Sequence, residues 1–404
     1  MKRLIRKIVP QLAVNLFRHL PTAVLANLIY GFPSRKMTVI GVTGTDGKTT
    51  TVNMIYQILK TAGKKVSMVS TINAEIAGKS YDTGFHVTNP DPLMLQRFIQ
   101  MAKKAGEEYL VLEVTSHGLD QYRAWGVRFD IGVITNITHE HLDYHKSWEN
   151  YFKAKAKLIK NVRVAVLNRA EKHFDRLKSL TSGNVVSFGL TKQADFYPVK
   201  FPFKLLLPGE YNILNALAAS AVAVQIGIDT AIIRKTLENF SSLEGRMNEI
   251  ENKRGIKIVV DFAHTPNALK EALQALKPKN KTRLISVFGS AGARDVEKRS
   301  LMGEISAQYA DITVITAEDP RGELEKINAQ ILEGAQKANG VLGKNVFIEG
   351  DRQKAIKMAI DQLAKPGDTV GIFGKGHEKS MNYDGHQEIS WSDHLAVKKV
   401  LEKK

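Results

Sequence analysis

A glycine-rich loop between a predicted strand and a predicted helix constrains this chain most. The segment Gly41-Val-Thr-Gly44-Thr-Asp-Gly47-Lys48-Thr49-Thr follows the β-branched run 37–42 and precedes the amphipathic stretch 51–59. Glycines let backbone N–H groups approach phosphate oxygens, the lysine supplies positive charge, and the hydroxyl can ligate magnesium. The general spacing of such loops would place a glycine where Val42 stands, so this is a variant. The order strand, loop, helix predicts a phosphate-binding site.

Two series of short apolar runs predict two α/β units. The first series covers 37–42, 66–70, 109–114, 131–135 and 162–167, and the second covers 257–261, 282–288, 311–316, 345–348 and 369–373. Amphipathic stretches alternate with the runs, which is typical of a mostly parallel sheet covered by helices on both faces. A length of 404 residues also exceeds the roughly 250–300 at which single cores stop growing. We expect a helical arm (1–36), a central P-loop ATPase domain (37–243) and a Rossmann-like doubly wound domain (244–404), with the linker near 241–246.

The first residues of the chain are strongly basic. Residues 1–45 hold seven Lys and Arg and no Asp or Glu, and so contribute +7 of the net charge of +17. Pro10 and Pro21 interrupt the segment, which predicts two short basic amphipathic helices. Either they pack on their own domain, or they lie on an anionic membrane surface. No apolar run reaches the ~18 residues of a membrane span, and no cleavage site of a signal peptide follows.

Composition narrows the class of protein further. The hydrophobic fraction of 43% and charged fraction of 25% are those of a soluble globular protein. The absence of cysteine excludes disulfides, thiolate zinc sites and cysteine nucleophiles, and fits a reducing cytoplasm. The positive net charge favours anionic partners. No aromatic residues interleave with the basic ones as a single-strand groove requires, so we expect no nucleic-acid partner.

Two further residues are candidates for binding a metal ion beside the loop. Glu113 and His141 each follow a predicted strand, at the carboxyl edge where open α/β sheets bind ligands. A carboxylate and a neutral imidazole can both hold magnesium that bridges phosphate and substrate. The alternative for His141 is a capping or core histidine.

Several strings in this sequence resemble those of the Mur ligases, in the same order. The loop 44–50 resembles their ATP loop, which more often carries Asn where Asp46 stands. The other matching strings are Glu113-Val-Thr-Ser-His117-Gly-Leu, Thr135-Asn136-Ile-Thr-His-Glu-His141-Leu-Asp143, Tyr151-Phe-Lys-Ala154-Lys155, Leu243-Glu-Gly245-Arg246, Asp261-Phe-Ala263-His264 and Gly374-Lys375-Gly376-His377-Glu378. The resemblance runs from about residue 37 to the C-terminus and is closest to the MurE-type members, which add the third residue of the peptidoglycan stem peptide. It implies a cytoplasmic ligase that uses ATP and Mg²⁺, forms an acyl phosphate on a muramoyl-peptide carboxylate, and joins it to an amino acid.

The resemblance also implies roles for individual residues. The catalytic set is Lys48, Glu113, His141 and Lys155, and the magnesium ligands are Thr49, Glu113, His141 and a carbamylated Lys155. On composition alone, Lys155 would belong to a solvated basic helix face, because Lys153 and Lys157 flank it. The ATP-binding set is Gly44, Thr45, Asp46, Gly47, Lys48, Thr49, Thr50, Asn136, Asn212, Asn215, Arg246, Asp261 and His264.

Two substrate sets complete the assignment. Thr88, Asn89, Thr115, Gln121 and Arg123 would contact the acceptor, and Asp319, Arg321, Gly374 and Glu378 would contact the amino acid. Arg321 can clamp a distal carboxylate bidentately, as in diaminopimelate-adding members. Asp319 stands where those members carry Asn, and its added charge favours a different diamino acid such as lysine.

One departure from the family affects the acceptor. MurE-type members carry a further domain before the loop, and it holds the uridine diphosphate end of the substrate. Here only a short arm precedes Gly41. Either the central domain holds the nucleotide sugar, or the acceptor is lipid-linked. Alternative functions are a folylpolyglutamate-type or cyanophycin-type ligase and an ATP-dependent scaffold that does not ligate.

Overall fold

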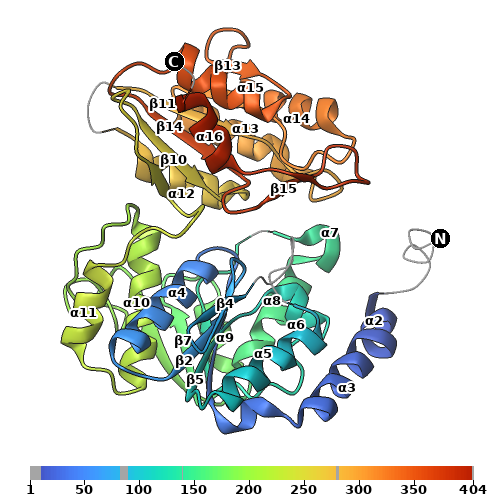
Figure 1. The fold of residues 1–404 in the computed structure, drawn as a ribbon, viewed down its shortest axis with the longest axis vertical. Coiled ribbons are helices and arrows are strands. Elements are labelled where there is room, and N and C mark those ends of the chain that lie inside the picture. The colour runs from blue at the N-terminus through green and yellow to red at the C-terminus, as the bar shows by residue number, and fades with distance from the viewer. Residues whose placement is uncertain (1–10, 82–89, 139, 279–281, 403–404) are drawn as a thin grey trace. The chain divides into compact units, whose positions relative to one another are not determined.

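The chain folds into two compact units, shown in Figure 1. The computed structural model describes residues 11–81, 90–138, 140–278 and 282–402. The first unit comprises Met1–His139, His145–Leu205 and Tyr211–Phe240, and the second comprises Glu140–Tyr144, Leu206–Glu210 and Ser241–Lys404.

The first unit is built on an eight-stranded sheet with the order β4-β3-β2-β5-β1-β6-β7-β8. Six of the strands run parallel: β1 (Thr38–Thr43), β2 (Val66–Val69), β5 (Tyr109–Glu113), β6 (Ile131–Ile134), β7 (Val164–Asn168) and β8 (Asn184–Phe188). The short strands β3 (Ala74–Ile76) and β4 (Lys79–Tyr81) extend one edge antiparallel. The five predicted strands are confirmed to within two residues, and β3, β4 and β8 were missed.

Helices cover this sheet and position its carboxyl edge. They are α4 (Lys48–Thr61), α5 (Pro92–Lys104), α6 (Ser116–Asp120), α8 (Trp148–Ala156), α9 (Phe174–Ser179), α10 (Glu210–Gln225) and α11 (Thr230–Glu238). The short helix α7 (Leu142–His145) falls mostly in the segment Glu140–Tyr144, which groups with the second unit. The central strands β1, β5, β6 and β7 are buried along almost their whole length and consist mostly of apolar residues, as is typical of strands buried on both faces. Leu110 and Leu112 pack under α5, while Ala165 and Leu167 pack against α8 and α9 side chains.

The N-terminal segment differs from its prediction. Instead of two helices broken at Pro21, α2 (Gln11–Val14), a π-helical turn (Asn15–His19) and α3 (Leu20–Tyr30) form one uninterrupted helix. Proline lacks an N–H donor and its ring clashes with the carbonyl four residues earlier. The wider π turn just before Pro21 shifts that carbonyl, so the helix continues until Gly31, where φ is +65°. Among the described residues, the helix Gln11–Tyr30 is long and apolar enough to cross a membrane, by length and composition only, although polar residues such as Asn15 and Arg18 interrupt it.

The second unit contains a six-stranded sheet with the order β13-β12-β11-β14-β10-β9. Its parallel strands are β10 (Lys257–Asp261), β11 (Leu284–Phe288), β12 (Ile312–Ile315), β13 (Val346–Ile348) and β14 (Thr369–Phe373), and β9 (Asn248–Ile250) is antiparallel. The helices of this unit include α12 (Pro266–Leu276), α13 (Glu297–Tyr309), α14 (Leu324–Lys337), α15 (Arg352–Lys357), a π-helical turn (Met358–Leu363) and α16 (Asp393–Glu402). The short strands β15 (Ser380–Met381) and β16 (Ile389–Ser390) form a separate antiparallel pair. All five predicted strands are confirmed, and β9, β15 and β16 were missed. The predicted α/β class holds for both units.

Candidate active site

The glycine-rich loop lies at the N-terminus of α4 and has no room for a side chain at Gly44 or Gly47. A Cβ atom on Gly44 would lie 1.7 Å from Thr135 Oγ1, and one on Gly47 would lie 2.2 Å from Asn215 Oδ1. Gly47 also has a φ of +80° and directly precedes the helix. The first-turn N–H groups of a helix have no carbonyl partner within it, so they present donors and a positive dipole end to an anion. The loop is therefore built for phosphate.

Residues after β6 hold the loop in shape. Asn136 Oδ1 accepts hydrogen bonds from the backbone N–H of Thr45 (3.1 Å) and of Asp46 (2.9 Å). Thr135 Oγ1 donates to the Asp46 carbonyl at 2.6 Å. Asn136 was predicted to bind ATP, and here it contacts the loop backbone. Thr135 was missed as a site residue, although it directly precedes Asn136 at the end of a strand.

A buried carboxylate lies beside the loop. Glu113, the last residue of β5, accepts hydrogen bonds from Thr49 Oγ1 at 3.0 Å and 3.2 Å. Its oxygens also accept from the backbone N–H (2.9 Å) and the hydroxyl (2.7 Å) of Thr71. Because β2, β5 and β1 are neighbours in the sheet, their carboxyl ends bring these three side chains together. Thr71 was missed, since strand order is not visible in the sequence.

Two lysines reach the same loop. Lys48 Nζ donates to the Thr45 carbonyl at 2.8 Å, and Lys155 Nζ donates to the Gly44 carbonyl from helix α8. Lys155 is only 1% exposed and lies 4.6 Å from the centre of the Tyr151 ring. The interpretation of Lys155 as part of a solvated basic face is wrong, because tertiary packing turns this residue inward.

Helix α10 contributes two buried asparagines. Asn215 Oδ1 accepts a hydrogen bond from Thr51 Oγ1 at 3.3 Å, and Asn215 Nδ2 donates to Asn212 Oδ1 at 3.4 Å. Both side chains lie within the helix and not at its cap. Asn215 thus supports α4 and Gly47.

The residues predicted for the acceptor are only partly described. Thr115 caps α6 by accepting a hydrogen bond from the Gly118 N–H at 2.9 Å. Gln121 Oε1 accepts two hydrogen bonds from the Arg123 guanidinium, at 2.7 Å and 3.0 Å. Thr88 and Asn89 lie outside the described residues.

In the second unit, three predicted nucleotide residues gather around Phe262, and of the three only Asp261 is buried. The Arg246 guanidinium stacks 4.5 Å from the Phe262 ring centre, and His264 Nδ1 lies 3.0 Å from the Phe262 carbonyl oxygen. Asp261 accepts hydrogen bonds from the backbone N–H of Met247 (2.7 Å) and of Ala263 (2.8 Å). Burial raises the pKa of Asp261 against the opposing effect of Arg246. The three motifs around Arg246, Asp261 and His264 therefore converge on one surface of this unit.

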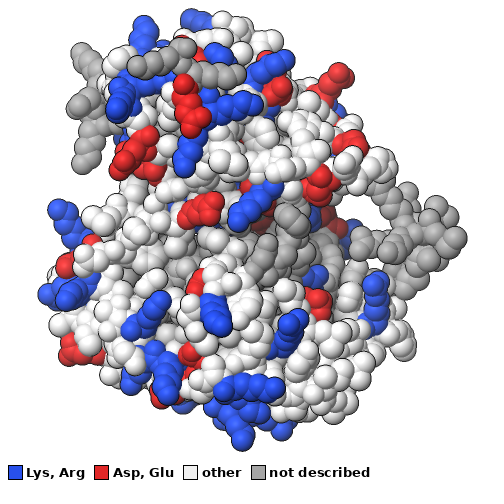
Figure 2. Space-filling view, viewed as in Figure 1, with Lys and Arg blue, Asp and Glu red and all other residues white. Residues whose placement is uncertain are grey.

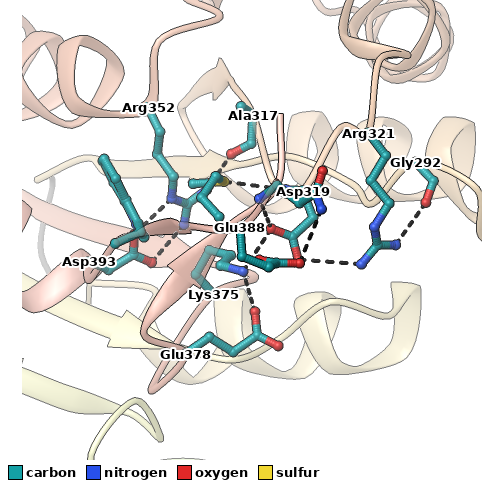
Figure 3. Close-up of polar contacts among 12 residues, drawn as sticks. Gly292, Ala317, Asp319, Arg321, Arg352, Lys375, Glu378, Glu388 and Asp393 are labelled. Atoms are coloured by element: carbon teal, nitrogen blue, oxygen red, sulfur yellow. Dashed lines mark hydrogen bonds and ion pairs between the residues drawn. The ribbon is translucent and has the colours of Figure 1, made fainter. Parts of the chain in front are cut away.

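The residues predicted to bind the amino acid form a charged network, shown in Figure 3. Asp319 Oδ1 accepts hydrogen bonds from Lys375 Nζ (3.0 Å) and from the Asn382 N–H (2.9 Å). Lys375 also pairs with Glu378, and Arg321 Nη1 donates to the Gly292 carbonyl at 3.0 Å. Lys375, which sequence reasoning did not name as a site residue, compensates the extra charge of Asp319.

Neighbouring residues make this network rigid. Gly374 has a φ of +105°, and a Cβ there would lie 2.1 Å from Glu318 Oε2. Burial raises the pKa of Glu318 to about 8. Arg352 binds Asp393 through two hydrogen bonds of 2.7 Å and also donates to the carbonyls of Ala317 and Phe373.

Comparison with known proteins shows the family to which the chain belongs. Residues 42–223 match the Mur ligase middle domain, and residues 245–376 match the Mur ligase glutamate ligase domain. The chain belongs to the Mur ligase family. Two similar relatives are UDP-N-acetylmuramoyl-L-alanyl-D-glutamate–2,6-diaminopimelate ligases, and both place this Mur ligase with the MurE type. The enzyme of Aquifex aeolicus is 36% identical, covering 93% of this chain and 80% of the relative, and that of Synechocystis sp. is 37% identical, covering 93% and 78%.

Solved structures agree with this membership. A UDP-N-acetylmuramoyl-L-alanyl-D-glutamate–2,6-diaminopimelate ligase aligns with a TM-score of 0.60 at 29% identity, covering 91% of this chain and 78% of the other. MurF of Acinetobacter baumannii shares the fold, with a TM-score of 0.71 at 19% identity over 95% and 81% of the two chains. As a Mur ligase, the protein is an ATP-dependent, ADP-forming amide ligase of peptidoglycan biosynthesis.

The magnesium ligands predicted for this Mur ligase fit the metal in part. Thr49 and Glu113 supply hard oxygen donors within 3.2 Å of each other, which suits an ion that binds few protein groups and keeps phosphate and water ligands. The described residues contain no cluster of three or more His, Asp or Glu side chains that could hold a metal alone. His141 belongs to the segment Glu140–Tyr144, which groups with the second unit, and its φ is +58°. Within the first unit, the structure brings Thr49, Glu113, Lys48 and Lys155 to the same loop.

Proposed function

We propose that this enzyme joins a diamino acid, with diaminopimelate as the preferred one, to the carboxylate of a UDP-linked muramoyl dipeptide. The observation that carries the proposal is the pairing of Thr49 with Glu113 beside a loop that admits no side chain at Gly44 or Gly47. The amine assignment rests on Arg321, and it agrees with the names of the relatives, which are diaminopimelate ligases.

In the first step, an oxygen of the acceptor carboxylate attacks the γ-phosphorus of ATP. The bond from that phosphorus to the bridging oxygen breaks, and ADP leaves. Phosphoryl transfer depends mainly on positioning and on electrostatic stabilisation. Lys48 and the N–H groups at the start of α4 would stabilise the charge on the phosphates. Magnesium, held by Thr49 and Glu113, would neutralise the charge that builds up on the transferred group.

In the second step, the amine nitrogen attacks the acyl carbon. The bond from this carbon to the phosphate oxygen breaks, inorganic phosphate leaves, and the amine loses a proton. Arg321 would bind the distal carboxylate of the incoming amino acid, because a guanidinium matches a carboxylate bidentately. Asp319 does not offer a free charge to the amine, since Lys375 already compensates it.

A lipid-linked muramoyl acceptor is a second candidate, favoured by the exposed apolar side chains of the N-terminal helix, such as Phe17 and Leu28. We propose a cytoplasmic location, where the UDP-linked acceptor would be in solution and the lipid-linked acceptor would be reached at the inner membrane face.

The test is release of ADP from the full chain with ATP and magnesium. UDP-muramoyl dipeptide and its lipid-linked counterpart are each combined with diaminopimelate, lysine or glutamate, and with no amine. The proposal expects turnover that needs both acceptor and diaminopimelate, and loss of turnover in Lys48→Met but not in the exposed Lys172→Met. ATP hydrolysis independent of any amine would instead identify a scaffold, and turnover with a folate acceptor would identify a different ligase of the superfamily.

A further inference from the structure

We propose that the outward face of the helix Gln11–Tyr30 docks the enzyme on an anionic lipid bilayer, with the helix lying in the plane of the interface. This outer face consists of Leu12, Leu16, Phe17, Leu25, Leu28 and Ile29. All six side chains are exposed, and Phe17 is 84% exposed. The described residues contain nineteen large exposed apolar side chains, and six of them fall in this one helix of 20 residues. Such a concentration marks a surface that contacts something apolar.

The opposite face of the helix is fixed to the first unit. Asn15 Nδ2 donates to Asp120 at 2.8 Å, and Asn27 Nδ2 donates to the Trp125 carbonyl at 2.7 Å. Ala23 and Ala26 are fully buried on this face, and their small side chains allow close packing against the domain, where α3 lies beside α5 (Figure 1). A helix that crosses the bilayer would have to give up these contacts and carry the two asparagines into hydrocarbon, which is costly. An interfacial helix keeps them, because only its outer face enters the lipid.

The positive charge around this helix favours an anionic lipid surface as the partner of its outer face. Residues 1–45 carry seven basic and no acidic side chains. Arg18, Arg35 and Lys36 are exposed in the structure. Figure 2 shows mostly uncharged surface at the lower right, where Figure 1 places α2 and α3. A second copy of the chain on this face would bring two such basic segments together, whereas anionic headgroups attract them.

A half-exposed tryptophan supports the same orientation. Trp125 lies next to the helix end, with its ring centre 6.3 Å from that of Phe32, and it is 36% exposed. Tryptophan and basic side chains together are typical of the headgroup level of a bilayer. The Arg35 guanidinium stacks 4.3 Å from the Phe32 ring centre and so places a cation at the same level.

The test is flotation of the full chain with vesicles made of phosphatidylglycerol and phosphatidylcholine in equal parts, compared with phosphatidylcholine alone. We expect binding to the anionic vesicles to be at least about tenfold stronger and to weaken with salt. Phe17→Ser/Leu28→Ser should reduce it by about tenfold or more. The matched control Leu342→Ser/Leu395→Ser removes two exposed side chains of the second unit and should bind like the unchanged protein.

Three results would overturn the proposal. The first is equal binding by the two double variants, provided that both keep the far-ultraviolet circular dichroism and the vesicle-free ATP turnover of the unchanged protein. The second is concentration-dependent dimerisation that Phe17→Ser/Leu28→Ser abolishes in the absence of lipid binding, which would assign the face to a second copy. The third is retention in the membrane after alkaline carbonate extraction, which releases peripheral proteins and would indicate a spanning helix.

Discussion

Thr49 Oγ1 donates a hydrogen bond of 3.0 Å to the carboxylate of Glu113, which joins the first turn of α4 to the end of β5. The pair is buried, and Thr71 supplies two further donors to the same carboxylate. Three donors on one buried carboxylate fix it in position. The glycine-rich loop and the Glu113 carboxylate are therefore held beside each other by contacts within the protein itself.

The first prediction concerns this pair. Glu113→Gln should lower turnover by at least about 100-fold and raise the magnesium concentration needed for half-maximal rate, because a neutral amide is a weaker ligand. Thr49→Ser keeps the hydroxyl and should stay close to the unchanged enzyme, whereas Thr49→Ala should resemble Glu113→Gln. Magnesium titrations of the steady-state rate distinguish these outcomes. Glu108→Gln, on the exposed loop before β5, is the control; a loss there equal to that of Glu113→Gln would contradict the assignment.

The second prediction concerns Gly47. Alanine at this position combines a φ of +80° with a clash at 2.2 Å against Asn215 Oδ1, and such strain costs about 1–3 kcal/mol. Gly47→Ala should therefore bind ATP roughly tenfold or more weakly. Gly63→Ala has a similar φ of +72° but nothing within 4 Å, so it isolates backbone strain from the clash. Isothermal titration with ATP should show a large loss only in Gly47→Ala, part of which Asn215→Ala restores in the double variant.

The third prediction concerns Lys155. If its side chain carries a carbamate, Lys155→Arg cannot, and turnover should fall by at least about 100-fold. Lys153→Arg is the matched control, because Lys153 lies on the same helix but is exposed and pairs with Glu149 at the surface. Bicarbonate depletion should slow the unchanged enzyme and leave the residual rate of Lys155→Arg unaffected. Equal rates with and without bicarbonate would show that the buried lysine acts as a cation on the Gly44 carbonyl.

The fourth prediction concerns pH. Burial raises the pKa of Glu318 from 4.5 to about 8, so the folded state binds this proton more tightly than the unfolded state does. The contribution to stability is fully present below about pH 4.5 and is lost as pH rises toward about 8, and the total is on the order of a few kcal/mol. Glu318→Gln stays neutral, so its second unit should lose less stability between about pH 5 and about pH 9. Urea unfolding at about pH 5 and about pH 9 measures this difference. The control is Glu323→Gln: the pKa of the Glu323 carboxyl is lowered and its side chain is exposed, so this variant should not flatten the pH dependence of stability.

Much of the fold was predictable from local sequence, but the site was predictable only in part. Strands β10 and β14 match their predictions at both ends: the β-branched residues of β10 stand between Lys257 and Asp261, and β14 lies between Asp368 and Gly374. The three-residue strands β3 and β4 were missed, since they are short and partly exposed at an edge. The N-terminal helix was missed as a single element because a π turn accommodates Pro21.

The site shows where local reasoning fails. Thr71 and Thr135 enter the loop region only because β2, β5, β1 and β6 are neighbours in space, and the sequence does not reveal that order. Lys155 sits among exposed lysines in the sequence, and only packing of α8 turns it inward. The importance of Lys375 follows from its pairing with Asp319, which lies 56 positions away along the chain.

The last prediction concerns the choice of amine. Arg321 Nη1 is held by the Gly292 carbonyl, and Arg321 Nη2 lies 3.7 Å from Asp319, so the guanidinium is oriented before substrate binds. Removing a charge-assisted bidentate contact costs about 1.5–3 kcal/mol, so Arg321→Met should lower kcat/KM for diaminopimelate by roughly 10- to 100-fold. Lysine lacks the distal carboxylate, so kcat/KM for lysine should change little in Arg321→Met. The ratio of kcat/KM for diaminopimelate to that for lysine should therefore fall. Asp319→Asn should shift this preference much less, because Lys375 and not the substrate compensates the carboxylate. Arg294→Met, an exposed arginine nearby, serves as the control, and a uniform loss for both amines in Arg321→Met would show that Arg321 supports the loop without reading the substrate.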